Sequence, residues 1–154
     1  MRVLVTGGFG FIASELTRQL VDAGHTVAVV DPLTYAGDPS NLAELEGKFE
    51  HYLCGVEDKD IHPLIAHFKP DVIYHAAAES HVDRSIASYE KFVGTNIIGT
   101  FNLVEAARAL AVPPKFVYVS TDEVYGSLPE GRASEGTQVN PCNPYAVSKS
   151  AAEQ

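Results

Sequence analysis

Two residues near the end of the chain, Tyr145 and Lys149, have the spacing of an acid–base pair. On a helix, positions i and i+4 lie on one face, so the phenol and the ammonium would be neighbours. The positive charge would stabilise the phenolate and lower the pKa of Tyr145 from its ordinary value of about 10. A tyrosine tuned in this way can take a proton from a sugar hydroxyl while a hydride leaves for a nicotinamide. The alternative is a chance pair on the protein surface.

A glycine-rich turn near the N-terminus has the features of a dinucleotide-binding site. Residues 6–13 read T-G-G-F-G-F-I-A, between a strand-like run and a helical pattern. We expect Gly7 to permit the tight turn and Gly10 to let a pyrophosphate approach the helix N-terminus. Ala13 is small enough for the helix and the strand to pack closely. The alternative, an ordinary glycine-rich connection, is disfavoured by the strand–turn–helix context.

Asp31 ends a second strand-like run and fits the position that selects the dinucleotide. A carboxylate there accepts hydrogen bonds from the ribose hydroxyls of NAD. It would also repel a 2′-phosphate, and the residues that follow, Pro32 and Leu33, offer no cation to NADP. The alternative is an aspartate in an ordinary turn before proline. Together with the glycine turn, Asp31 predicts NAD as the cofactor.

Two further polar segments follow strand-like runs, where ligands bind in open α/β sheets. In residues 120–126, hydroxyls at Ser120 and Thr121 precede carboxyls at Asp122 and Glu123, which could act as an acid and a base. The alternative for this segment is a helix-capping signature. Residues 76–85 combine small side chains, which allow close approach of a cofactor, with polar ones. The six histidines have no ligand spacing, so we expect structural or solvated side chains and no metal.

Strand-like runs alternate with helical patterns along the chain, which predicts an α/β domain with a parallel sheet covered on both faces. The expected strands are residues 2–6, 26–31, 49–54, 71–76 and 115–120, the third of them near an edge. The expected helices are residues 11–23, 40–46, 60–68, 88–110 and 144–154, with a cap at Ser40 or Asn41 and a long loop over 121–143.

The composition limits the partners. The 154 residues suffice for one domain, and 20 acidic against 11 basic residues give a net charge of −9. This charge argues against nucleic acid and anionic membranes as partners. We also expect no membrane span and no signal peptide, because the first strand begins directly after Met1. Two distant cysteines indicate reduced thiols, so the expected localisation is cytoplasmic.

The glycine turn, Asp31 and the Tyr145–Lys149 pair together resemble the extended short-chain dehydrogenase/reductase superfamily. Within it, residues 33–37, 77–85 and 120–126 are similar to the dTDP-glucose 4,6-dehydratase family. The resemblance implies a Rossmann-type doubly wound sheet with strand order 3-2-1-4-5, so that residues 1–154 form an NAD-binding domain. It ends near the midpoint of a family member, so we expect the last strands and the substrate domain to be missing and the isolated chain to be inactive.

The resemblance also implies which residues bind the ligands. For NAD these are Gly7, Gly10, Phe11, Ile12, Asp31, Leu33, Thr34, Ala36, Gly37, Ala76, Ala77, Ala78, Ser80, Thr95, Ser120, Tyr145 and Lys149. For a nucleotide-sugar substrate they are Ser80, Ser85, Thr121, Asp122, Glu123 and Tyr145.

The activity implied by the resemblance is the dehydration of dTDP-glucose to dTDP-4-keto-6-deoxyglucose. Tyr145, assisted by Lys149 and Thr121, would deprotonate the 4-hydroxyl as hydride passes to NAD. Glu123 would then remove the proton at C5, Asp122 would protonate the departing 6-hydroxyl, and the hydride would return to C6. Two alternatives stay open. One is another nucleotide-sugar epimerase, dehydratase or decarboxylase of the superfamily, and the other is a non-catalytic NAD-binding module if the chain ends at residue 154.

Three positions depart from the family pattern. Ala13 replaces the third glycine, and Pro32 stands where a basic residue is expected beside the ribose. Around residues 54–56 the family has an aspartate that touches adenine. In this chain the aspartate is absent or shifted to Glu57 or Asp58, so an altered affinity for the cofactor is expected.

The helix expected over residues 88–110 carries more apolar side chains than one face can hold. They are Tyr89, Phe92, Val93, Ile97, Ile98, Phe101, Leu103 and Val104. A helix in an outer layer needs one apolar stripe against the sheet. The surplus and the family resemblance predict a homodimer in which this helix pairs with the Tyr145 helix. The alternative is that the missing half of the chain covers it.

Overall fold

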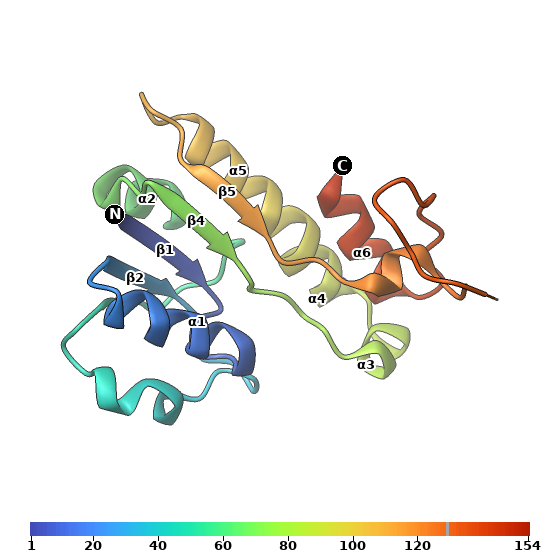
Figure 1. The fold of residues 1–154 in the computed structure, drawn as a ribbon, viewed down its shortest axis with the longest axis horizontal. Helices are drawn as coiled ribbons and strands as arrows, with labels where there is room; N and C mark the ends of the chain where they lie inside the picture. Colours follow the sequence, from blue (N-terminus) through green and yellow to red (C-terminus); the bar gives the residue numbers. More distant parts are fainter. Residues whose placement is uncertain (129) are drawn as a thin grey trace.

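The computed structural model of the chain describes residues 1–128 and 130–154. Within these residues, five parallel strands form one sheet in the order β3-β2-β1-β4-β5 (Figure 1). The strands are β1 (Arg2–Thr6), β2 (Thr26–Val30), β3 (Glu50–Tyr52), β4 (Val72–His75) and β5 (Lys115–Tyr118). The predicted strand order is confirmed, and the short β3 lies at an edge as predicted.

Helices cover both faces of this sheet. The α-helices are α1 (Phe11–Asp22), α2 (Ile61–Phe68), α3 (Val82–Ala87), α4 (Glu90–Phe92), α5 (Thr100–Arg108) and α6 (Pro144–Glu153). Side chains alternate between the two faces of a strand. Val3 and Val5 of β1 therefore pack with α1, whereas Leu4 between them packs with α2 and α5. The doubly wound arrangement follows from this alternation.

The helix predicted as one regular element over residues 88–110 has three parts. A π-helical segment, η2 (Val93–Gly99), separates α4 from α5, and the helical stretch runs from Glu90 to Arg108. Gly99 is required where this stretch passes the loop after β3, because a Cβ there would lie 2.5 Å from a methyl group of Val56. π segments are frequent at functional sites. Within η2, the side chain of Asn96 holds two parts of the candidate site together, as described below.

Three short elements differ from the sequence-based expectation. Helix α3 lies in a stretch expected to be a loop, and the 3₁₀-helix η3 (Asp122–Tyr125) lies inside the predicted loop over 121–143. Thr121 caps η3 by accepting the N–H of Glu123, so the capping interpretation of this segment is correct for its local structure. The 3₁₀-helix η1 (Pro39–Leu45) is capped by Asp38, and the predicted cap at residue 40 or 41 is wrong.

The carboxyl ends of all five strands lie at one edge of the sheet, because the strands are parallel. Helices α3 and α6 lie beyond this edge (Figure 1). The segments that follow β1, β2, β4 and β5 therefore converge there, as expected for a ligand site in an open α/β sheet.

Candidate functional site

A cleft of about 600 Å³ lies at this edge of the sheet. Its lining contains most of the residues predicted to bind NAD, which are Gly7, Gly10, Phe11, Ile12, Asp31, Thr34, Ala36, Gly37, Ala76, Ala77, Ala78, Ser80, Thr95, Ser120, Tyr145 and Lys149. Among the described residues, Leu33 of the predicted cofactor set and the predicted substrate residues Ser85, Thr121, Asp122 and Glu123 do not belong to this lining.

The glycine turn forms one end of the cleft through its backbone geometry. Gly7 has φ +70°, donates its N–H to Val30 O at 2.8 Å, and lies so close to Ala77 that a Cβ would approach the Ala77 Cα to 2.9 Å. Gly10 is the N-cap of α1, and among the described residues no side chain caps this helix end. The free N–H groups of the first turn are therefore available to an anion such as a pyrophosphate.

Asp31 is buried and fixes the turn from the side of β2. Its Oδ2 accepts the N–H of Phe9 at 3.0 Å, and its Oδ1 accepts the N–H of Leu33 at 2.8 Å. A carboxylate offers about four lone-pair sites, so Asp31 retains acceptor capacity towards the cleft that it lines. Gly37 packs on this carboxylate, because a Cβ there would lie 2.8 Å from Oδ1.

Glu57 and Asp58, the two candidates for the expected aspartate, lie near the far end of the cleft in different surroundings. A Cβ on Gly55 would lie 2.8 Å from Glu57 Oε2, so the Glu57 carboxylate occupies the space of a side chain at position 55. Asp58 accepts the N–H of Gly55 at 2.6 Å through Oδ2, and it does not belong to the cleft lining among the described residues. Glu57 lines the cleft, and Thr95 donates to its Oε1 at 3.5 Å.

Tyr145 and Lys149 lie on one face of α6, and both line the cleft as predicted. Lys149 is buried and donates from Nζ to the Val119 carbonyl at 2.7 Å. The same ammonium lies 4.1 Å from the ring centroid of Tyr118. Burial lowers the pKa of Lys149 to about 8. Ser120, the next residue along the cleft, has a buried hydroxyl without a hydrogen-bond partner among the described residues.

The predicted lowering of the Tyr145 pKa is wrong for this chain. Burial raises the pKa of Tyr145, and the carboxylates of Glu123 and Asp122 raise it further. A hydrogen bond with Thr121 acts in the opposite direction. The physical reason is that loss of water around the phenol outweighs the single favourable hydroxyl, while the Lys149 ammonium is directed at a backbone carbonyl.

The predicted substrate residues after β5 border the Tyr145 end of the cleft. Thr121 and Glu123 are half-buried and Asp122 is exposed. Glu123 Oε2 accepts a hydrogen bond of 2.7 Å from the amide of Asn143, whose own Oδ1 caps α6. Glu123 is therefore attached to the N-cap of the helix that carries Tyr145.

The two predicted serines differ in accessibility. Ser80 is exposed and lines the cleft. Ser85, by contrast, is fully buried and donates to Val82 O at 2.7 Å. In this structure Ser85 therefore presents no surface to a substrate, and its hydroxyl stabilises α3.

Sequence reasoning missed Asn96, which joins three parts of the site. Its Oδ1 accepts the N–H of Glu79 at 2.8 Å, and its Nδ2 donates to Glu79 O and to Ser148 Oγ, both at 2.9 Å. The side chain is buried in η2 and fixes both the loop after β4 and helix α6. An asparagine directly before Ile97 and Ile98 in a largely apolar helical pattern is the signal that could have identified it.

His75 is structural, as predicted for the histidines, and supports the same loop. Its ring is fully buried between Thr6 Oγ1 at 2.7 Å from Nδ1 and Thr100 Oγ1 at 2.9 Å from Nε2. Thr100 gives its hydroxyl proton to Asn96 O, so the ring donates from Nε2 and accepts from Thr6 at Nδ1. Burial lowers the pKa of His75 to about 3.

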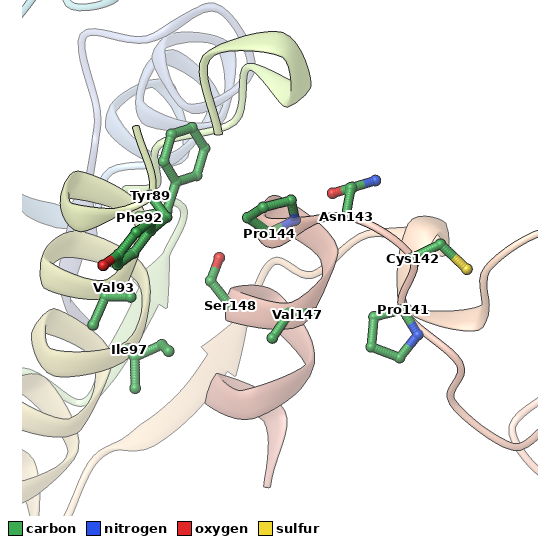
Figure 2. A pocket seen from close by; sticks show the side chains of 10 residues that line it. All are labelled: Tyr89, Phe92, Val93, Ile97, Pro141, Cys142, Asn143, Pro144, Val147 and Ser148. Carbon is green, nitrogen blue, oxygen red and sulfur yellow. The ribbon is translucent and has the colours of Figure 1, made fainter. Parts of the chain in front are cut away.

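A second, apolar pocket of about 490 Å³ lies between the α4–η2 stretch and α6. Figure 2 shows side chains from α4 and η2 on one wall and from α6 with the preceding segment on the other. Its lining is Tyr89, Phe92, Val93, Ile97, Pro141, Cys142, Asn143, Pro144, Val147 and Ser148. Of the apolar residues predicted to exceed one face, Tyr89, Val93, Ile98, Phe101 and Val104 are exposed, whereas Phe92 and Leu103 are buried.

Two features are absent from the part of the chain that the structure describes. No group of three or more His, Cys, Asp or Glu side chains there is arranged to hold a metal ion. No helix there has both the length and the apolar character needed to cross a membrane.

Comparison with known proteins identifies a family for nearly the whole chain. A family model described as GDP-mannose 4,6 dehydratase matches residues 4–154. A probable dTDP-glucose 4,6-dehydratase of Sinorhizobium fredii is 43% identical over 99% of this chain and 47% of its own length. The dTDP-glucose 4,6-dehydratase of Escherichia coli is 42% identical over 99% of this chain and 48% of its own length. The chain thus spans about half the length of these relatives.

Solved structures show the same pattern. The dTDP-glucose 4,6-dehydratase DesIV of Streptomyces venezuelae, solved with NAD bound, matches with a TM-score of 0.91 and 42% identity. The match covers 99% of this chain and 49% of that enzyme. A UDP-glucose 4-epimerase of Thermus thermophilus in complex with NAD also matches with a TM-score of 0.91, at 36% identity, over 99% of this chain and 49% of its own. Fold similarity alone therefore does not separate dehydratases from epimerases.

Proposed function

Because the chain belongs to the GDP-mannose 4,6-dehydratase family of extended short-chain dehydrogenases/reductases, we propose that it forms the NAD-binding half of a nucleotide-sugar dehydratase acting on dTDP-glucose. The observation that carries this proposal is the cleft itself. It combines the Gly7–Gly10 turn with Tyr145 and Lys149, and the Asp122–Glu123 pair borders its Tyr145 end. The similarity to dTDP-glucose 4,6-dehydratases over the whole chain supports the choice of substrate.

The residues of the cleft fit NAD. The uncapped N-terminus of α1 suits the pyrophosphate, and the remaining lone pairs of Asp31 suit the adenosine ribose hydroxyls. The carboxylate of Glu57, which also lines the cleft, would accept a hydrogen bond from the exocyclic amine of adenine. The buried hydroxyl of Ser120 offers a polar partner at the opposite end. Asp31 would also repel the 2′-phosphate of NADP.

Bound NAD would accept a hydride from C4 of the sugar and later return it to C6. Tyr145 is the proposed base for the 4-hydroxyl, because its phenol lines the cleft and bonds with the Thr121 hydroxyl. Lys149, with its pKa lowered to about 8, remains mostly protonated at neutral pH. Its buried positive charge would offset the cost of forming a buried phenolate at Tyr145 as NAD and sugar fill the cleft.

In this proposal, Asp122 and Glu123 catalyse the elimination of water. A ketone at C4 makes the proton at C5 acidic, and Glu123 is the proposed base for that proton. Asn143 donates to the Glu123 carboxylate and so fixes its orientation. Asp122, which is exposed, would protonate the departing 6-hydroxyl. Two neighbouring carboxyls can divide acid and base roles when their environments differ.

The test is the reaction of a purified protein containing this chain with NAD and dTDP-glucose. Mass spectrometry should detect a sugar nucleotide that has lost one water. Tyr145→Phe should abolish all conversion, because oxidation at C4 comes first. Glu123→Gln should still permit oxidation but slow water loss by about 10²–10⁴-fold, the usual effect of removing a general base. Unchanged product formation in Glu123→Gln would contradict the assigned role.

A nucleotide-sugar 4-epimerase is the second candidate, because an epimerase matches the fold as closely as the dehydratase does. Epimerisation would invert C4 without loss of water, so the same mass measurement separates the two activities. NAD binding with neither outcome would favour a non-catalytic module.

The proposed assembly is a homodimer formed through the η2–α5 surface and α6. Phe101 is 70% exposed on α5, and the apolar pocket of Figure 2 is lined by Val93 and Ile97 of the same helical stretch and by Val147 of α6. Phe101→Glu should convert a dimer into a monomer in sedimentation at micromolar concentration. Val112→Glu is the matched control, because Val112 is also exposed but lies beyond the end of α5. A clean monomer of the unmodified chain would count against the dimer.

A further inference from the structure

Two loops on opposite sides of the cleft are joined by side chains. Tyr35, in the loop after β2, donates its hydroxyl to Glu79 Oε2 at 3.1 Å in the loop after β4. The guanidinium of Arg84 on α3 lies 4.0 Å from the centroid of the Tyr35 ring. Thr34 and Ala36, which flank Tyr35, line the cleft, and so does Glu79 itself. The Tyr35 bridge, meaning Tyr35, Glu79 and Arg84, thus connects the loops that border the cleft.

Both ends of the Tyr35 bridge are fixed to the protein. The backbone of Glu79 is held on both its N–H and its carbonyl by Asn96. The loop that carries Tyr35 is fixed at its start by the Leu33 N–H bond to Asp31, and at its end by the Asp38 N–H bond to Phe9 O. Because the loops that carry Tyr35 and Glu79 border the cleft, movement of Tyr35 away from Glu79 would change the width of the cleft opening.

We propose that the Tyr35 bridge closes the cleft over a bound dinucleotide and slows its dissociation, which makes Tyr35 a positioning residue for the cofactor. This inference rests on the proposed function. In that reaction the hydride taken from C4 must return to the same sugar, so the reduced dinucleotide has to remain bound between the two transfers. A slow exit step serves this requirement.

The Tyr35 bridge is weak enough to open. Tyr35 is 54% exposed, and its contact with Glu79 is a surface hydrogen bond. Burial and the Glu79 carboxylate raise the pKa of Tyr35, so the phenol remains a hydrogen-bond donor throughout the neutral range. Loss of one such bond corresponds to a change of about 3- to 10-fold in a rate or equilibrium constant. The bridge is therefore expected to delay release without preventing entry of the dinucleotide.

The test measures the dissociation rate of NADH from the purified chain by stopped-flow fluorescence, with excess NAD to prevent rebinding. Tyr35→Phe should release NADH about 3- to 10-fold faster, and Tyr35→Ala faster still, because the Arg84 contact is also lost. The matched control is Tyr52→Phe, which removes a surface tyrosine–glutamate bond, to Glu50, outside the cleft. It should leave the dissociation rate unchanged.

A purely structural role for Tyr35 would give a different pattern. It would lower the thermal stability and the fraction of chain that binds, while the dissociation rate from the remaining folded protein would stay the same. Arg84→Lys, which retains the cation, should release NADH more slowly than Arg84→Ala. An unchanged NADH dissociation rate in both Tyr35 variants would overturn the proposed role of the Tyr35 bridge and leave the proposed function intact. Absence of NADH binding by the unmodified chain overturns the proposed function together with it.

Discussion

The cofactor end and the acidic end of the site are built in different ways. At the cofactor end, Gly7 has a backbone conformation that few residues adopt, and the buried Asp31 is held by two backbone N–H groups. At the acidic end, Asp122 is exposed, and the carboxylate of Glu123 accepts a hydrogen bond from Asn143. The first region is thus preorganised by the fold of this chain. In the second region, the chemistry of the side chains matters more than their contribution to stability.

The largest expected effect comes from Gly7→Ala. A side chain in the left-handed region costs about 1–2 kcal/mol, and overlap of the new Cβ with the Ala77 backbone adds about 1–3 kcal/mol. Urea unfolding should show the sum, and NAD binding should be lost. Gly24→Ala is the control, since Gly24 also has positive φ but a Cβ there meets nothing within 4 Å among the described residues. Equal losses in both variants would mean that close packing at the turn is unimportant.

The next effect is expected for Asp31→Asn. The amide has one acceptor oxygen, so it can accept from either the Phe9 or the Leu33 N–H but not from both with its former strength. Loss of one bond to a charged acceptor should reduce the free energy of unfolding by about 1.5–3 kcal/mol. The preference for NAD over NADP in calorimetric titration should also narrow. Unchanged stability would show that the carboxylate does not organise the turn.

A third prediction concerns acid, through His75. The ring is neutral in the folded protein because burial lowers its pKa to about 3, whereas an unfolded histidine takes up a proton below about 6.5. The contribution of neutral His75 to the free energy of unfolding is therefore complete above pH 6.5 and is lost as the pH falls towards 3. Between pH 7.5 and 5.0 the loss should be about 2 kcal/mol in urea unfolding. His75→Gln should remove this dependence, and an equally steep dependence in that variant would refute the assignment.

The smallest effect on stability is expected for Glu123→Gln. Glu123 is half-buried, and glutamine retains an oxygen that accepts from Asn143. The free energy of unfolding should change by less than about 0.5 kcal/mol, although the variant should slow water loss strongly. A stability loss as large as that of Asp31→Asn would remove the contrast between the two ends of the site.

The positions of the strands and the cofactor end could be predicted because both depend on local patterns, whereas the strand order was implied by the family resemblance. Continuous apolar runs locate the buried strands, and the glycine turn with Asp31 occurs at a fixed place in such a sheet. The π segment could not be predicted, because its apolar spacing is the same as that of a regular helix. Helix α3 was missed because six residues are too few to show a helical period.

The electrostatics of the site also lay beyond sequence reasoning. The direction of the Tyr145 pKa depends on how deeply the phenol is buried and where the Lys149 ammonium is directed, and neither follows from their spacing. The difference between Glu57 and Asp58 likewise depends on the loop conformation, because only the structure shows that Glu57 lines the cleft and that Asp58 accepts the Gly55 N–H.

The π segment η2 has a consequence for how the helix on its two sides packs. A π turn accommodates one extra residue locally, so the helix on either side keeps its rotational phase. Phe92 before the segment and Leu103 after it are both buried, while Asn96 within it holds the loop after β4. Asn96 therefore makes its polar contact from within the wider π turn, while Phe92 and Leu103 on its two sides remain packed in the core.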